Sequence, residues 1–130
     1  MEDFVTFEIA KKLKEKGFRE ECLYHYQNCG DYAEANRIPG DDRYDFNTDY
    51  LYQCNNNDSY LIDAPTISQV LKWLREEKKL HICISLGEFS DWVYDISKIE
   101  GNVFCEAMDG FHSYEEAALA GVNYCLENLI

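Results

Sequence analysis

The central stretch from Pro65 to Glu76, PTISQVLKWLRE, is the feature that most restricts how this chain can fold. Thr66 and Gln69 have the spacing of a capping box, in which the threonine hydroxyl accepts from a backbone N–H and the glutamine side chain returns to the cap. Apolar residues then recur at helical spacing on one stripe, which Trp73 widens on one flank: Ile67, Val70, Leu71 and Leu74. Ile67, Leu71 and Leu74 are expected in the core. The stretch therefore predicts a helix with one buried face.

Two more helices are predicted towards the ends of the chain. The first lies within residues 4–18, with Thr6 as its N-cap and Gly17 just past its last turn, the position that glycine favours in a Schellman stop. The other begins at a second capping box, formed by Ser113 and Glu116, and continues to the C-terminus. Each carries apolar residues at helical spacing, so each is expected to cover a sheet.

Six short runs rich in aromatic and β-branched residues predict strands: 22–27, 50–54, 59–62, 81–86, 92–97 and 102–108. The second and third flank the polar run Asn55-Asn56-Asn57-Asp58, which is typical of a turn, and so predict a hairpin. The last three are joined by short turns and predict a meander. Residues 28–48 have no periodicity and predict a long loop.

These elements predict a single α+β domain with the order α-β-loop-ββ-α-βββ-α. Strands joined by hairpins pair antiparallel, and the three amphipathic helices need a face to cover, so a two-layer arrangement with a largely antiparallel sheet is expected. The 130 residues show no linker and no internal repeat. A chain of this length usually forms one domain, here spanning residues 1–130.

Composition indicates a cytoplasmic protein with no membrane partner. No apolar stretch is long enough to span a bilayer, and the acidic start of the chain does not resemble an export signal. Free thiols are the expected state of cysteine in reducing cytosol, and no pair of cysteines has C-x-x-C spacing. Free thiols are therefore predicted at all six positions: Cys22, Cys29, Cys54, Cys83, Cys105 and Cys125.

No catalytic residue, metal or cofactor is predicted. The stretch 45–56 begins like a calcium loop but lacks glycine at its sixth position and the bidentate glutamate at its twelfth. His81 and Cys83 share one face of a predicted strand and Cys105 lies on another, but three soft ligands fall short of a structural zinc site. No histidine has a recognisable relation to a cysteine nucleophile, and no phosphate-binding glycine motif occurs.

The net charge of −13 is concentrated in two blocks. Residues 21–64 carry two basic against nine acidic side chains, and residues 81–130 carry one against nine. Such a surface disfavours direct binding of nucleic acid or an anionic membrane and favours a basic protein partner. Within the long loop, acidic and aromatic residues alternate closely, and we predict that these contact a partner: Asp41, Asp42, Tyr44, Asp45, Phe46 and Asp49.

Three segments of the chain carry a resemblance: FVTFEIAKKLKEKGF, APTISQVLKWLREEKKL and YEEAALAGVNYCLENLI. Together they resemble a family of small uncharacterised proteins encoded in prophages and mobile elements of gut bacteria. In that family an APT…W-[LF]-R-E helix and a terminal YEEA helix recur. The resemblance covers both ends and the centre of the chain, and it implies no activity or catalytic residue.

The leading hypothesis is therefore a non-enzymatic accessory protein of a phage or mobile element, which binds a protein partner through its acidic loop. Two alternatives stay open. One is a small enzyme or ligand-binding domain with a pocket between sheet and helices. The other is an acidic inhibitor of a nucleic-acid enzyme, which imitates the charge of phosphates.

Overall fold

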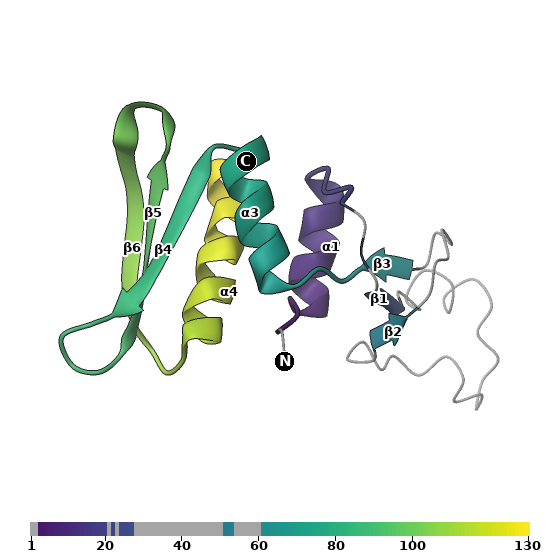
Figure 1. Ribbon diagram of the computed structural model, residues 1–130, viewed down its shortest axis with the longest axis horizontal. Helices are drawn as coiled ribbons and strands as arrows, with labels where there is room; N and C mark the ends of the chain where they lie inside the picture. Colours follow the sequence, from purple (N-terminus) through teal and green to yellow (C-terminus); the bar gives the residue numbers. More distant parts are fainter. Residues whose placement is uncertain (1–2, 21, 23, 28–50, 54–60) are drawn as a thin grey trace. The chain divides into compact units, whose positions relative to one another are not determined.

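The computed structural model describes residues 3–20, 22, 24–27, 51–53 and 61–130 (Figure 1). Its elements follow one another as α1 (Phe7–Glu15), β1 (Tyr24–Gln27), β2 (Leu51–Gln53), β3 (Leu61–Asp63), α3 (Ile67–Glu77), β4 (Leu80–Leu86), β5 (Trp92–Lys98), η2 (Glu100–Asn102), β6 (Val103–Phe111), α4 (Tyr114–Tyr124) and η3 (Cys125–Leu129). The predicted α+β class and the predicted order of helices and strands are confirmed.

The chain divides into two compact units. One comprises Val5–Pro65, and the second comprises Met1–Phe4 together with Thr66–Ile130. Each unit contains one three-stranded antiparallel sheet among its described residues. The predicted single domain over residues 1–130 stays a prediction.

In the unit Val5–Pro65, α1 begins and ends where its capping residues place it. Thr6 accepts from a backbone N–H of the first turn. Gly17 has a φ of 91°, and two backbone bonds close the helix end: Phe18 N–H donates to Leu13 O over 2.9 Å, and Gly17 N–H donates to Lys14 O over 3.3 Å. These are the two bonds of a Schellman motif, so this helix end is local in origin.

The predicted hairpin between residues 50–54 and 59–62 is wrong. β2 and β3 do not pair with each other, because β1 lies between them and pairs antiparallel with both. Buried Tyr26 of β1 fixes this inner position, since its hydroxyl donates to Val5 O over 2.6 Å and its ring meets that of Phe7 edge-on. A polar turn brings two strands close together, but it does not prevent an earlier strand from inserting between them.

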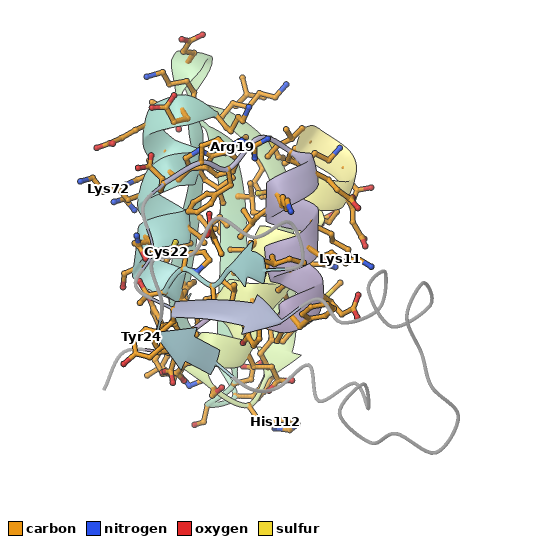
Figure 2. The ribbon with its side chains drawn as sticks, turned by 90° about the vertical axis from the view of Figure 1, so that its right-hand side faces the viewer. Lys11, Arg19, Cys22, Tyr24, Lys72 and His112 are labelled. Carbon is orange, nitrogen blue, oxygen red and sulfur yellow. The ribbon has the colours of Figure 1, made fainter. Side chains whose placement is uncertain are left out.

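In the second unit, the start of α3 forms the predicted capping box. Gln69 N–H donates to Thr66 Oγ1 over 3.2 Å, and Thr66 N–H donates to Gln69 Oε1 over 3.1 Å. Side chains on the opposite face of the helix, such as Lys72, project outwards (Figure 2). The two bonds satisfy donors that a helix end otherwise leaves unpaired.

The core face of α3 differs in part from the predicted one. Ile67 and Leu74 are buried as expected, but Leu71 is only half-buried. Val70 on the predicted stripe and Trp73 on its flank are also buried, because α3 packs against both β4 and α4.

The sheet β4-β5-β6 is the predicted meander, and α3 and α4 both lie on the same side of it (Figure 1). Its helix side carries the buried side chains of Ile82, Tyr94 and Ile96. Side chains of alternate residues, including exposed Cys83 and Asp95, point to the other side, which we call the open face.

The start of α4 uses its predicted capping residues in a slightly different way. Ser113 Oγ accepts from Glu116 N–H over 3.1 Å, as expected, but the Glu116 carboxylate accepts from His112 N–H over 2.9 Å, one residue before the cap. Ala118 and Val122 of this helix are fully buried. The helix continues as the π-helical turn η3 up to Leu129.

Candidate functional site

The predicted partner-binding residues lie outside the part of the chain that the structure describes: Asp41, Asp42, Tyr44, Asp45, Phe46 and Asp49. Residues 45–50 and 54–56 of the calcium-like stretch also lie outside it, as do Cys29 and Cys54. The contribution of the acidic loop to a binding surface therefore stays a prediction.

The residues considered as zinc ligands are not brought together. His81 and Cys83 are exposed on the open face of β4, whereas Cys105 lies on β6, with β5 between the two strands. Among residues 3–20, 22, 24–27, 51–53 and 61–130, no group of three or more potential ligands could hold a metal ion. The four described cysteines are free thiols, as predicted: Cys22, Cys83, Cys105 and Cys125.

Large apolar side chains are exposed at several described positions, and β6 carries more of them than any other described element. Three large apolar side chains of this strand are exposed: Val103 by 50%, Phe104 by 62% and Met108 by 52%. Residues opposite each other in antiparallel strands share a face. Met108 lies opposite buried Tyr94, so it is on the helix side, and Phe104 lies opposite Ser97 on the open face. β6 therefore presents apolar side chains to solvent on both faces, and we call these three residues the β6 surface.

The position of α4 explains why the helix side of β6 is open. Gly121 faces the sheet so closely that a Cβ there would lie 3.1 Å from Ile82 Cγ2 and 3.3 Å from Tyr94 Cγ. The buried face of α4 is built from small side chains: Ala117, Ala118, Gly121 and Val122. The helix therefore sits low over β4 and β5, which are its main contacts, and leaves Met108 half-exposed.

A polar contact joins α4 to β6 beside the β6 surface. Tyr124 donates its hydroxyl hydrogen bond to the carboxylate of Glu106, and desolvation followed by the charge of Glu106 raises the pKa of Tyr124. Desolvation and then Glu106 also raise the pKa of buried Tyr94. Both phenols therefore stay protonated at neutral pH, so they can donate hydrogen bonds but do not act as bases there.

The two buried thiols are unreactive for a related reason. Burial raises the pKa of Cys125 to about 12, with a smaller contribution from Cys105. Burial, followed by the charges of Asp63 and Glu20, raises the pKa of Cys22 to about 12. The thiolate is the nucleophilic form of cysteine, so neither thiol is activated.

These shifts predict a pH dependence of stability. The pKa of each thiol is raised above its ordinary value of 9.0, so the stabilisation is fully present below pH 9 and is lost as the pH rises from 9 to 12. The upper limit is about 1.4 kcal/mol per pH unit for each thiol, and incomplete burial reduces it. Urea unfolding at pH 8, 9 and 10 should show a shallower decline for Cys125→Ala. Cys83→Ala, at an exposed thiol, is the matched control, and an equally steep decline in both variants would contradict the prediction.

Acidic side chains surround the β6 surface. Glu106 and Asp109 lie on the same strand, and Asp95 and Glu100 lie on β5 and the turn before β6. Lys98 is the one lysine or arginine in residues 81–130. The surface therefore combines exposed apolar side chains with an acidic surround.

A second exposed apolar site lies at the turn between β4 and β5, where Phe89 is 86% exposed. Asp91 holds this turn against β6, since its Oδ2 accepts from Gly110 N–H over 2.7 Å and its backbone oxygen accepts from Gly87 N–H over 2.7 Å. Phe89 belongs to the turn that follows β4, whose last residue, Leu86, is also exposed. Because it lies outside β6, Phe89 serves below as a comparison for the β6 surface.

The β6 surface was not predicted from the sequence, although the sequence contains a signal for it. A half-buried strand alternates apolar and polar residues, whereas the stretch Val103-Phe104 places two large apolar residues side by side. One of any such pair must leave the buried face. The loss of alternation at these two positions was therefore the available signal.

Comparison with protein-family models, with curated proteins and with solved structures yields no match. None of the helices within the described residues is long and apolar enough to cross a membrane.

Proposed function

We propose that this protein is a non-enzymatic accessory protein that binds a protein partner, and that the β6 surface is a contact site. The observation that carries the proposal is the exposure of Val103, Phe104 and Met108 on one strand. Scattered exposed apolar residues are common. These three lie within residues 103–108 of an edge strand, so a partner at this edge can contact both faces of β6.

The charges around this surface indicate the chemistry of the partner. Protein interfaces commonly have an apolar centre and a polar rim. Here the rim is acidic, with Glu106 and Asp109 on the same strand as the apolar residues. A partner that supplies apolar side chains together with lysine or arginine fits both features. Such charge complementarity also speeds association and makes it sensitive to salt.

The shape of β6 favours contact through side chains rather than through the backbone. Its pairing with β5 has register shifts between Trp92 and Tyr94 and between Ile96 and Ser97. Such bulges twist an edge strand and interrupt the row of backbone groups that another strand needs. A partner that packs on Phe104 and Met108 does not need that row.

The acidic loop belongs to the same proposal as a second contact. Asp41, Asp42, Tyr44 and Asp45 add negative charge and an aromatic side chain to a protein that already favours a basic partner. The resemblance to prophage and mobile-element proteins supports an accessory role but does not identify the partner.

The test begins with the partner captured from a lysate of the native host and eluted by steps of salt. Binding of that partner is then measured for Phe104→Ser with Met108→Ser. Loss of central apolar contacts should weaken binding roughly tenfold to a hundredfold. The matched control is Phe89→Ser, which removes an exposed aromatic ring from the turn between β4 and β5 and should leave binding within about twofold of wild type.

A second variant combines Asp41→Asn, Asp42→Asn, Tyr44→Ser and Asp45→Asn, and it should weaken binding most at low salt. Thermal unfolding monitored by circular dichroism establishes that each variant is folded. Unchanged affinity in both variants would refute the proposed sites. Unchanged affinity in the loop variant alone would assign the contact to β6.

A further inference from the structure

The two edges of the sheet β4-β5-β6 differ in a way that the fold does not require. β6 is interrupted by two register shifts and carries Glu106 and Asp109, and both features protect an edge strand from pairing with another chain. β4 pairs with β5 in unbroken register from Leu80 opposite Lys98 to Leu86 opposite Trp92. None of its seven residues is charged and none is proline. Within β4 itself, therefore, no charge, proline or register shift protects the edge.

Two hydrogen bonds fix the direction of the backbone groups of β4. Gly87 N–H donates to Asp91 O over 2.7 Å at one end of the ladder, and Ile99 N–H donates to Lys79 O over 2.9 Å at the other. Hydrogen-bonded and non-hydrogen-bonded pairs alternate along an antiparallel ladder. The odd-numbered residues of β4 therefore direct their backbone groups to β5, and four even-numbered residues direct theirs to the free edge: Leu80, Ile82, Ile84 and Leu86.

The neighbours of β4 carry opposite charges at its two ends. Lys78 and Lys79 precede the strand, and Glu88 follows it. In an antiparallel pair of two β4 strands, the basic end of each copy lies next to the acidic end of the other. Two chains of net charge −13 repel each other in general. β4 itself carries no charge, and at each of its two ends lysines of one copy attract a glutamate of the other.

We propose that two copies of this protein pair antiparallel through the free edges of β4, about a two-fold axis at Cys83, and so form one continuous six-stranded sheet. This register overlaps all seven residues of both strands. It places Ile82 of one copy opposite Ile84 of the other, and Leu80 opposite Leu86. The contact is self-complementary, as a two-fold interface must be. It uses backbone groups and does not involve the β6 surface.

The register makes a prediction about one thiol. Cys83 occupies a non-hydrogen-bonded position on the free edge, where directly opposite Cα atoms are about 4.5 Å apart. Its side chain is exposed on the open face. The two Cys83 thiols of a dimer therefore lie within reach of a disulfide bond. Trypsin releases residues 80–98 as one peptide in which Cys83 is the one cysteine, so the cross-link can be identified by mass spectrometry.

The first experiment measures the mass of the full chain by sedimentation equilibrium over a wide range of concentration. The expected result is a reversible dimer of twice the chain mass of 15.2 kDa. Brief oxidation with copper phenanthroline should then link residues 80–98 of one copy to the same peptide of the other. Cys83→Ser should abolish this linked peptide and leave the dimer mass unchanged.

The second experiment tests the register with charges. His81 and Ser85 are exposed on the open face, and the proposed pairing places each opposite the other residue of the second copy. Two double variants place like charges opposite each other at two points of the dimer: His81→Lys with Ser85→Lys, and His81→Glu with Ser85→Glu. Each should weaken dimerisation roughly tenfold. His81→Lys with Ser85→Glu changes the same positions but opposes unlike charges, so it should dimerise at least as well as wild type.

Mixing the two like-charge variants should restore dimers, since each supplies the charge that the other lacks. Circular dichroism establishes that all variants are folded. If the wild-type chain stays monomeric, the proposal is overturned. This holds even if a strand of another protein is found to pair with β4. A dimer that gives no linked peptide from residues 80–98 and responds equally to all three double variants also overturns it.

Discussion

Replacing Gly121 by valine is expected to destabilise the unit that contains α4 more than any other single change at a small residue. A Cβ at this position would already lie 3.1 Å from Ile82 Cγ2 and 3.3 Å from Tyr94 Cγ, closer than such atoms normally approach. Both neighbours are buried in the sheet and have little room to move. The two extra methyl groups of valine force α4 away from the sheet, at a cost of about 3 kcal/mol in the free energy of unfolding.

Gly121→Ala separates crowding from helix propensity. Alanine favours a helix over glycine by about 1 kcal/mol, which opposes the cost of the tight contacts. We therefore expect the alanine variant to lie much closer to wild type than the valine variant. Ala120→Val, at the half-buried position directly before Gly121, is the control for valine in a helix. Urea unfolding followed by tryptophan fluorescence measures all three, and equal losses for Gly121→Val and Ala120→Val would contradict the close-packing argument.

Replacing Ile96 by alanine should cost about 2–5 kcal/mol, because it leaves a cavity in the middle of the sheet. Ile96 is fully buried on β5, the central strand, where it lies opposite Ile82 on one side and Glu106 on the other. The surrounding backbone is held by two ladders, so it relaxes little around the missing atoms.

Asp95→Ala is the matched control, since this residue precedes Ile96 on the same strand but is exposed on the open face. It should change the free energy of unfolding by less than about 0.5 kcal/mol. Measured by the same denaturation, a loss below about 1 kcal/mol for Ile96→Ala would show that the helix side of β5 is not the core of this unit.

The features predicted correctly from the sequence are those that depend on neighbouring residues. The capping bonds of Thr66 and Gln69 and the Schellman bonds around Gly17 form between groups a few positions apart, so the sequence spacing determines them. The meander follows for the same reason, because short turns leave each strand next to its predecessor.

The features predicted wrongly depend on contacts distant along the chain. The insertion of β1 between β2 and β3 rests on the Tyr26 hydroxyl reaching Val5 O, twenty-one residues away. The partial exposure of Leu71, which was expected in the core, depends on where β4 and α4 pack. Neither of these packing contacts can be predicted from local periodicity.

For the candidate site, the acidic charge could be predicted from the sequence, but the position of the exposed apolar side chains could not. The excess of acidic side chains in residues 81–130 is the basis for proposing a basic partner, and it can be counted without any structure. Exposure of Met108 on the helix side of β6 depends on the lateral placement of α4, which Gly121 determines through its close contacts with Ile82 of β4 and Tyr94 of β5. Composition alone gives no information on that placement.

The buried thiols provide a way to learn how the chain unfolds. Cys22 lies in the unit Val5–Pro65 and Cys125 in the other, so each thiol becomes accessible to a maleimide only when its own unit opens. The rate of labelling at each position, resolved by peptide mass spectrometry, therefore gives a separate opening free energy for each unit. Equal values that change together with urea would mean that the chain unfolds as one cooperative domain. Different values would mean that one unit persists after the other has opened.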